Sequence, residues 1–141
     1  MTIWDLYKYL QKEGHEKLLH MTQSGFSILD NTIERTNNGI RVCIKERGAK
    51  IETQFDAADE VEACYFYYTR VSGGLLYLCH STDASCISVQ QAILENAGIA
   101  VWRKDMPHCS GPETTRYRIF VDGADLIPAQ ALLTATRGLS Q

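Results

Sequence analysis

The N-terminal residues of the chain carry a helical pattern of apolar and polar positions. The apolar residues follow the i, i+3, i+4, i+7 spacing of one helix face. Thr2 followed by Asp5 is typical of an N-terminal cap, and Gly14 comes shortly after the last apolar position. The pattern predicts an amphipathic opening helix. Its apolar face consists of Ile3, Leu6, Tyr7 and Leu10.

The next pattern has a period of two, which is the spacing of a strand with one buried face. A short apolar stretch at 26–29 is interpreted as a strand. Residues 40–55 alternate on both sides of Arg47 and Gly48, so they predict a hairpin with one face buried. The positions on that face are Ile40, Val42, Ile44, Ile51, Thr53 and Phe55.

Residues 57–70 carry conflicting signals. Asp56 can cap a helix, and several apolar positions after it repeat at helical spacing. The aromatic run at 65–68 favours a strand instead, with the SGG sequence at 72–74 as a hairpin turn. We interpret the segment as a helix. Its core positions would be Val61, Cys64, Tyr65 and Tyr68.

The remainder of the chain alternates between strand and helix patterns. Gly98 ends one helical segment, and the last helix starts at Asp125 with Pro128 in its first turn and ends at Gly138. We therefore expect an α+β fold with a largely antiparallel mixed sheet and about four helices. The predicted elements are a strand at 75–79, a helix at 87–97, strands at 99–103 and 115–121, and the final helix.

The composition indicates one globular domain. The 141 residues are 45% hydrophobic and 22% charged, unlike disordered chains, which combine low hydrophobicity with high charge. No linker divides the chain, so we expect a single domain over residues 1–141. No apolar run reaches the roughly 20 residues that cross a bilayer, and the N-terminus lacks the features of a secretory signal. A cytoplasmic location without a membrane partner is expected.

The charge balance argues against nucleic acid as a partner. Lys and Arg number 14 against 17 Asp and Glu, a formal net charge of -3, whereas neutralising phosphates requires clustered Lys and Arg. The five cysteines include no CxxC pair, and cytoplasmic thiols stay reduced. A disulfide framework is therefore not expected.

Two clusters of Cys and His raise the question of a metal site or a reactive thiol. A zinc site needs about four N or S ligands, and consecutive side chains of a strand point to opposite faces. Because Cys also packs as a small hydrophobic residue, we interpret these residues as packing or loop residues and expect no metal, cofactor or catalytic site. A zinc-binding protein and a thiol enzyme remain alternatives. The clusters contain Cys79, His80 and Cys86, and His108 and Cys109.

The segment 52–62 carries five acids without a basic residue and runs into a group of tyrosines. One interpretation is a solvated helix start, where acids favour the helix dipole. The other is a surface that steers a basic partner by charge and anchors it by tyrosine, so that reversing the charges of Asp59 and Glu60 slows association. We expect Tyr67 to be exposed, with its two neighbouring tyrosines in the core. The candidate partner-binding residues are Glu52, Asp56, Asp59, Glu60, Glu62, Tyr65, Tyr67 and Tyr68.

Three stretches give the chain the character of a small, acidic α+β domain with aromatic-rich strands and no assembled catalytic motif. They are MTIWDLYKYLQ, YYTRVSGGLLYLCHS and TRYRIFVDGADLIPAQALL. In this character the chain resembles the immunity proteins of bacterial contact-dependent growth inhibition and related polymorphic toxin systems. The resemblance implies a cytoplasmic protein, not an enzyme, that binds a cognate toxin C-terminal domain, often a nuclease, and blocks a surface which that toxin needs.

Two other functions fit the sequence. Arg116 and Arg118 share a strand face and can hold an anionic group. They fit a small-ligand-binding or regulatory domain built from residues 75–137. A cysteine-dependent enzyme would use Cys86, close to a predicted helix start, or Cys109.

Overall fold

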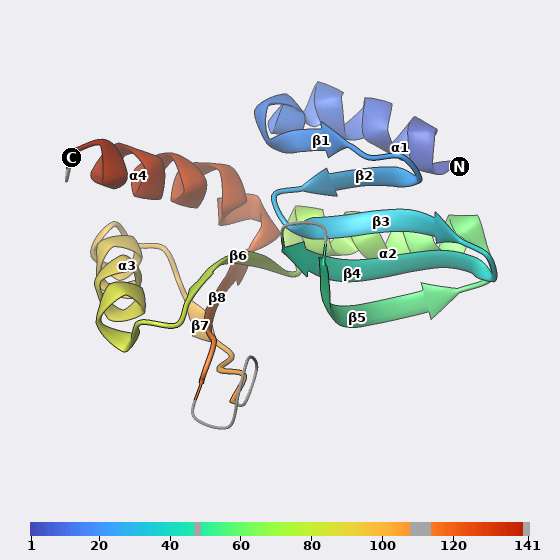
Figure 1. The fold of residues 1–141 in the computed structure, drawn as a ribbon. Helices are drawn as coiled ribbons and strands as arrows, with labels where there is room; N and C mark the ends of the chain where they lie inside the picture. Colours follow the sequence, from blue (N-terminus) through green and yellow to red (C-terminus); the bar gives the residue numbers. More distant parts are fainter. Residues whose placement is uncertain (47–48, 108–113, 140–141) are drawn as a thin grey trace. The chain divides into compact units, whose positions relative to one another are not determined.

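The computed structural model describes residues 1–46, 49–107 and 114–139. The chain divides into two compact units, Met1–Ser72 and Gly73–Gln141, each of which combines helices with an antiparallel sheet (Figure 1). The predicted α+β class is confirmed, and the described residues form four α-helices. The strands belong to two sheets of five and three strands. That residues 1–141 form a single domain stays a prediction.

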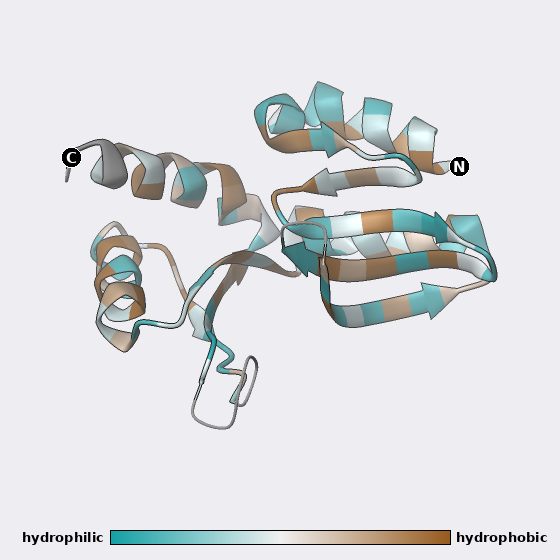
Figure 2. Ribbon diagram, in the orientation of Figure 1, coloured by the Kyte–Doolittle hydropathy of each residue, from teal (hydrophilic) through white to brown (hydrophobic). Residues whose placement is uncertain are grey.

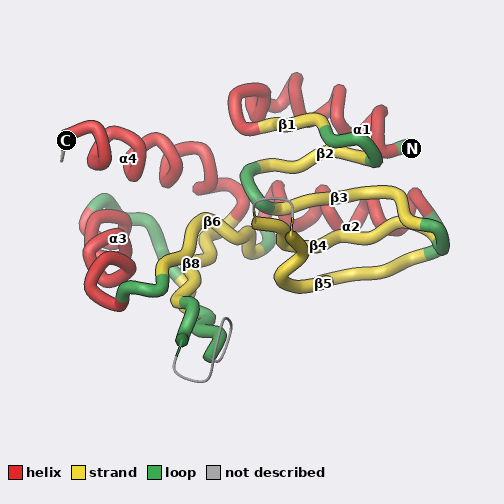
Figure 3. Tube along the Cα trace, viewed as in Figure 1, coloured by secondary structure: helices red, strands yellow, loops and turns green. Residues whose placement is uncertain are grey.

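The first unit contains a five-stranded antiparallel meander in which each strand pairs with the next along the chain (Figure 3). β2 is the predicted apolar strand, and β4 with β5 is the predicted hairpin. The sequence patterns did not reveal β1 or β3. The ladder between β4 and β5 carries two register shifts, between Val42 and Cys43 and between Ile44 and Lys45. The strands are β1 (Leu19–Met21), β2 (Gly25–Ile28), β3 (Asn31–Thr36), β4 (Gly39–Glu46) and β5 (Ala49–Ala57).

The opening helix, α1 (Ile3–Leu10), begins as predicted. The hydroxyl of Thr2 accepts a hydrogen bond from the Asp5 backbone N–H at 3.1 Å, and the Asp5 carboxylate accepts one from the Thr2 N–H at 3.0 Å. These two bonds form a capping box, which satisfies backbone donors that a helix start leaves without partners. Its fully buried residues are Ile3, Leu6 and Leu10.

The contested segment forms a helix, α2 (Glu60–Gly73), so the helical interpretation is confirmed. Its expected cap is wrong, because Asp56 still belongs to β5. The carboxylate of Asp59 instead accepts a hydrogen bond from the Val61 N–H at 2.9 Å. The strand continues past the expected helix start because β5 pairs with β4 as far as Ala57.

Both helices of the first unit pack on one face of its sheet. The ring of Phe26 on β2 meets Tyr7 of α1 and Tyr67 of α2 edge-on, each at a centroid distance of 5.4 Å. Phe26 lies opposite Ile33, which lies opposite Val42, so these apolar side chains form one row across the sheet. Figure 2 shows hydrophobic residues interspersed with hydrophilic ones along β3 and β4. α1 and α2 therefore cover the apolar face of this sheet, and neither of them packs on its polar face.

The second unit follows the predicted order of strand, helix, strand, strand and helix. Its strands pair in the order β6-β8-β7, and all pairs are antiparallel. A register shift between Tyr77 and Cys79 interrupts the pairing of β6 with β8. The predicted strand at 99–103 is shorter than expected. The elements are β6 (Leu75–Ser81), α3 (Ala84–Asn96), β7 (Trp102–Arg103), β8 (Tyr117–Asp122) and α4 (Leu126–Leu139).

Local sequence signals fix the ends of α3. The Asp83 carboxylate accepts hydrogen bonds from the N–H groups of Ser85 at 2.8 Å and Cys86 at 3.3 Å. Gly98 has φ of 85°, and the N–H groups of Gly98 and Ile99 return to the last turn, as in a Schellman motif. Gly98 thus ends α3 as predicted. In contrast, α4 continues through the expected stop at residue 138 to Leu139.

Candidate functional site

The acids of segment 52–62 do not share one surface. Glu52 lies opposite Ile44, on the helix-covered face of the sheet, where its charge attracts Arg70. Asp56 lies opposite Arg41 on the polar face. Simple alternation would place residues 52 and 56 on the same face. The register shift between Val42 and Cys43 places them on opposite faces.

Glu60 is a structural residue of the first unit. Its carboxylate accepts a hydrogen bond from the Ile3 N–H at 2.7 Å and one from the Arg35 guanidinium at 2.8 Å, and its side chain is only 22% exposed. The bonds to Glu60 join the start of α1 and strand β3 to the start of α2. Reversing the charge at Glu60 would break these contacts, so Asp59 and Glu62, both exposed, are the better positions for a test of steering.

The three tyrosines of α2 are distributed differently from the prediction. Tyr67 is 1% exposed, and its hydroxyl donates to the Asn31 carbonyl at 2.7 Å and accepts from the Ile28 N–H at 3.2 Å. Tyr67 is therefore a core residue and does not belong to a partner surface. Tyr65 is 71% exposed, so its assignment to the core was wrong. The buried stripe of α2 contains Ala63, Cys64, Tyr67 and Val71.

Residues of α1 and α2, with Glu13 after α1 and Asp59 before α2, form a surface that is here called the helical surface. The rings of Tyr9 and Tyr68 meet edge-on at a centroid distance of 5.6 Å. The Tyr68 hydroxyl donates to the Glu13 carboxylate at 2.8 Å. This hydrogen bond, and next a side-chain hydrogen bond between Tyr68 and Tyr9, raises the pKa of Tyr68 to about 12 and keeps its hydroxyl protonated. The helical surface consists of Tyr9, Glu13, Asp59, Val61, Glu62, Tyr65 and Tyr68.

The Cys and His residues of β6 and α3 have separate surroundings. The Cys79 thiol lies 3.5 Å from the side-chain oxygen of Gln90, whereas Nδ1 of His80 lies 2.6 Å from the Tyr77 hydroxyl. Cys86 is exposed in the first turn of α3. The predicted partners of this cluster, His108 and Cys109, lie outside the described residues. Within the described ranges, no three His, Cys, Asp or Glu side chains gather as metal ligands would.

The two buried thiols of the first unit have the properties of packing residues. Burial, and next the nearby Glu34 carboxylate, raises the pKa of the Cys43 thiol. Burial, followed by the Glu60 carboxylate, raises the pKa of Cys64 to about 11. Both thiols therefore stay protonated at neutral pH, and the thiolate is the nucleophilic form of cysteine.

Of the two arginines that were expected to hold an anion, Arg116 and Arg118, the second is engaged in contacts within the second unit. Arg118 is 6% exposed, and its Nε donates to the Lys104 carbonyl at 3.0 Å. Its guanidinium lies over the Phe120 ring, 5.3 Å from the centroid, and the Lys104 ammonium lies 4.7 Å from the same centroid. Such contacts stabilise cations against aromatic faces. They give Arg118 a structural role in the sheet.

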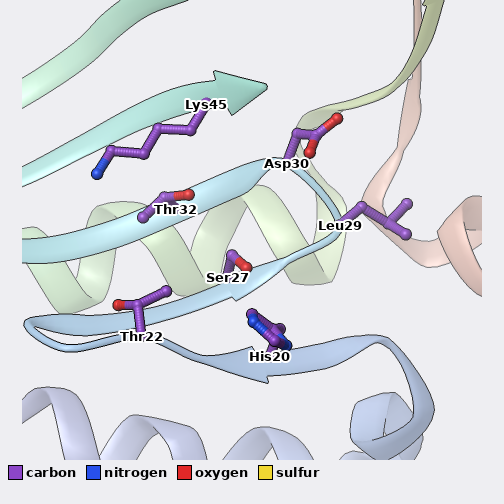
Figure 4. A pocket seen from close by; sticks show the side chains of 7 residues that line it. All are labelled: His20, Thr22, Ser27, Leu29, Asp30, Thr32 and Lys45. Atoms are coloured by element: carbon purple, nitrogen blue, oxygen red, sulfur yellow. The ribbon is translucent and has the colours of Figure 1, made fainter. Parts of the chain in front are cut away.

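A second candidate site lies on the polar face of the first sheet, where a cavity of about 280 Å³ is found (Figure 4). His20 on β1, Ser27 on β2 and Thr32 on β3 lie opposite one another in register. Leu29, in the turn between β2 and β3, also lines the cavity and has φ of 53°, a conformation unfavourable for a leucine. The polar residues of the lining are His20, Thr22, Ser27, Asp30, Thr32 and Lys45.

An ion-pair cluster borders this cavity. The Glu34 carboxylate, 5% exposed, accepts hydrogen bonds from Lys45 at 2.6 Å and from Arg41 at 2.7 Å. Burial alone would raise the pKa of Glu34, but the hydrogen bonds from Lys45 and Arg41 lower it below the usual value. The sequence does not reveal this cluster, because its central residue, Glu34, lies on β3, a strand without a clear apolar pattern.

The geometry thus defines an α+β protein with a helical surface rich in tyrosine and acids and a polar cavity on the opposite face of the first sheet. Comparison of the chain with known protein families, curated proteins and solved structures finds no match. Among the helices formed by the described residues, none has the length and hydropathy needed to cross a bilayer.

Proposed function

We propose that the protein is an immunity protein that binds and neutralises a cognate bacterial toxin domain in the cytoplasm. The proposed contact site is the helical surface. The observation that supports the proposal best is Tyr65, a large aromatic side chain that is 71% exposed in the middle of α2. Inhibition by contact requires no catalytic group and no cofactor in the inhibitor.

The helical surface exposes several large side chains together. Besides Tyr65, Val61 is 54% exposed and Tyr9 is 47% exposed. Single exposed apolar residues are normal on soluble proteins. Here, Val61 and Tyr65 occupy successive turns of α2, and Tyr9 reaches Tyr68 from the neighbouring helix. Tyrosine is enriched at binding hot spots because it offers a large, rigid contact area.

The charge of the surface favours a basic partner. Glu13 accepts a hydrogen bond from Tyr68, and Asp59 and Glu62 are exposed at the start of α2. Lys8 on α1 and Lys12 just after it add positive charge, so the acidic character is concentrated at the start of α2. Complementary charge accelerates encounter between proteins. Nucleases bind anionic phosphates through cationic surfaces, so a nuclease domain is the toxin class that this surface fits best.

The test is a neutralisation assay combined with association kinetics. Reading frames next to the gene of this chain are searched for a toxin-like C-terminal domain, which is expressed with the full chain or with a variant while cell survival is measured. We expect the wild type to restore growth and Tyr65→Ala to weaken binding by about 30-fold, as a hot-spot loss of about 2 kcal/mol implies. Glu62→Lys should slow association at low salt and have a smaller effect at high salt.

Val89 on α3 provides a matched control, because it is 59% exposed and therefore as accessible as Val61. Val61→Ser is expected to weaken binding, whereas Val89→Ser should neutralise the toxin as the wild type does. Unchanged binding by Tyr65→Ala and Glu62→Lys would remove the helical surface from the proposal. A chain that never restores growth would overturn the immunity function itself.

A further inference from the structure

We propose that the cavity on the polar face of the first sheet binds a small phosphorylated ligand, such as a sugar phosphate. This inference is independent of the immunity function, because the cavity and the helical surface lie on opposite faces of the sheet. It rests on the hydroxyl groups that line the cavity, on the charge next to them, and on the cavity's size.

The floor of the cavity is made of hydroxyl groups. Ser27 and Thr32 lie opposite each other on β2 and β3 and are 7% and 2% exposed. At the β1 side of the same cavity, the enclosed Oγ1 of Thr22 has no hydrogen-bond partner among the described residues. Buried polar groups are nearly always hydrogen-bonded. An enclosed hydroxyl without a partner at Thr22, in a cavity that Ser27 and Thr32 also line, therefore indicates a site where a ligand can accept hydrogen bonds.

The charge beside the floor is positive. Lys45 and Arg41 share the single carboxylate of Glu34, so the three groups together carry one net positive charge. The Lys45 ammonium has three N–H donors, of which the bond to Glu34 uses one. Figure 4 shows Asp30 at the far end of the cavity from Thr22, with its carboxylate directed away from the floor. Around the floor, donors therefore exceed acceptors.

This set of donors fits a phosphate group. Paired residues on neighbouring strands are about 5 Å apart, so the hydroxyls of Ser27 and Thr32 can donate to two oxygens of one phosphate while Lys45 supplies the charge. Lysine and hydroxyl side chains are common phosphate ligands, and hydrogen bonds to an anion are stronger than neutral ones. The pairing places a phosphate over β2 and β3, beside β4.

The remaining space defines the rest of the ligand. A volume of about 280 Å³ lies just below the range of about 300 to 1000 Å³ that is usual for small-molecule pockets, which limits the ligand to a compact molecule. Thr22 and His20 lie at the β1 side of the cavity (Figure 4). Their polar side chains suit a hydroxylated remainder, such as a sugar or polyol, better than an apolar one.

The experiment is an NMR titration of the full chain with ribose 5-phosphate, inorganic phosphate and ribose. We expect ribose 5-phosphate to shift the amide signals of Ser27 and Thr32 saturably, inorganic phosphate to act at the same residues more weakly, and ribose to have no effect. Inorganic phosphate binding as tightly as the ester would assign the site to the free ion. The absence of saturable shifts with either phosphate, or equal binding of ribose, would overturn the proposal.

Thr32→Val removes one hydroxyl while keeping a β-branched side chain of similar size, and it should weaken binding about tenfold. Thr53→Val is the matched control, because Thr53 lies on β5 in the same register row but outside the cavity lining. It should bind like the wild type. Equal affinities of the two variants would contradict the role of Thr32, and their melting curves show whether both are folded. Retained toxin neutralisation by Thr32→Val separates this site from the proposed immunity function.

Discussion

The two faces of the first sheet are built from the same strands, yet they differ in how their buried groups are stabilised. On the helix-covered face, Ile33 is 0% exposed and packs in a row of apolar side chains. On the other face, Thr32 is 2% and Glu34 is 4% exposed. Both faces thus contain buried residues near the centre of the sheet. The apolar face depends on packing and on removing surface from water, whereas Glu34 on the polar face depends on its hydrogen bonds with Arg41 and Lys45.

The largest effect is expected on the apolar face. Phe26→Ala removes the ring that contacts both helices, so it should lower the free energy of unfolding by about 3 to 5 kcal/mol. Met21→Ala is the control, because Met21 lies opposite Phe26 on β1 but is 56% exposed. Urea denaturation measures both. Similar losses for the two variants would contradict the assignment of Phe26 to the centre of the core.

A smaller effect is expected at the centre of the polar face. Glu34→Gln leaves two cations without their carboxylate, but Arg41 and Lys45 have side chains that are 27% and 29% exposed and remain partly solvated. The expected loss at neutral pH is therefore about 2 kcal/mol. Glu62→Gln, at an exposed position on α2, should stay within about 0.5 kcal/mol of the wild type.

The ion pairs of Glu34 also predict how the free energy of unfolding depends on pH. Since the folded-state pKa of Glu34 is lowered from 4.5, its contribution to stability is fully present above that value. It is lost as the pH falls from 4.5 through the lower folded-state pKa. Unfolding curves of Glu34→Gln should therefore depend less on pH in this acidic window than those of the wild type. An equal acid dependence would show that Glu34 is not ion-paired as described.

The smallest effect tests the distance between the backbones of β2 and β3. A Cβ at Gly25 would overlap the Ile33 carbonyl oxygen and would lie 2.8 Å from Cα of Glu34. Gly25→Ala should therefore destabilise by about 1 to 2 kcal/mol, because the backbones must separate. Gly73→Ala, at the end of α2 with open space around it, should be neutral or stabilising. Melting temperatures of the two variants that change in the same direction would contradict the close approach.

The helical face could be predicted from the sequence to a large extent, because its signals are local. The capping pair of Thr2 and Asp5 and the apolar spacing after it correctly located α1. In α2, the spacing of apolar residues predicted the wrong side of the helix to be buried. Tyr65 and Tyr68 gave an apparent apolar repeat, whereas the buried stripe includes the small residues Ala63 and Cys64, which hydrophobicity alone weights little.

The polar face could not be predicted, because its residues become neighbours only through strand pairing. β3 has Ile33 as its one strongly apolar residue, and it is recognised as a strand only through its partners β2 and β4. Its burial comes from tertiary context rather than from its own hydrophobicity. The register shifts of β5 added a second difficulty, because they place Thr53 opposite Cys43 on the polar face, whereas simple alternation had grouped Thr53 with Phe55 on the buried face.

Those register shifts also affect how the protein behaves at high concentration. β5 is the last strand in the sheet order and, with nine residues, the longest of the meander. A long, straight outer strand presents unpaired backbone groups on which another chain can add a strand, a common route to aggregation. The irregular pairing with β4 bends and twists such a strand. Another chain therefore pairs less readily with β5, and we expect less aggregation through this edge at high protein concentration.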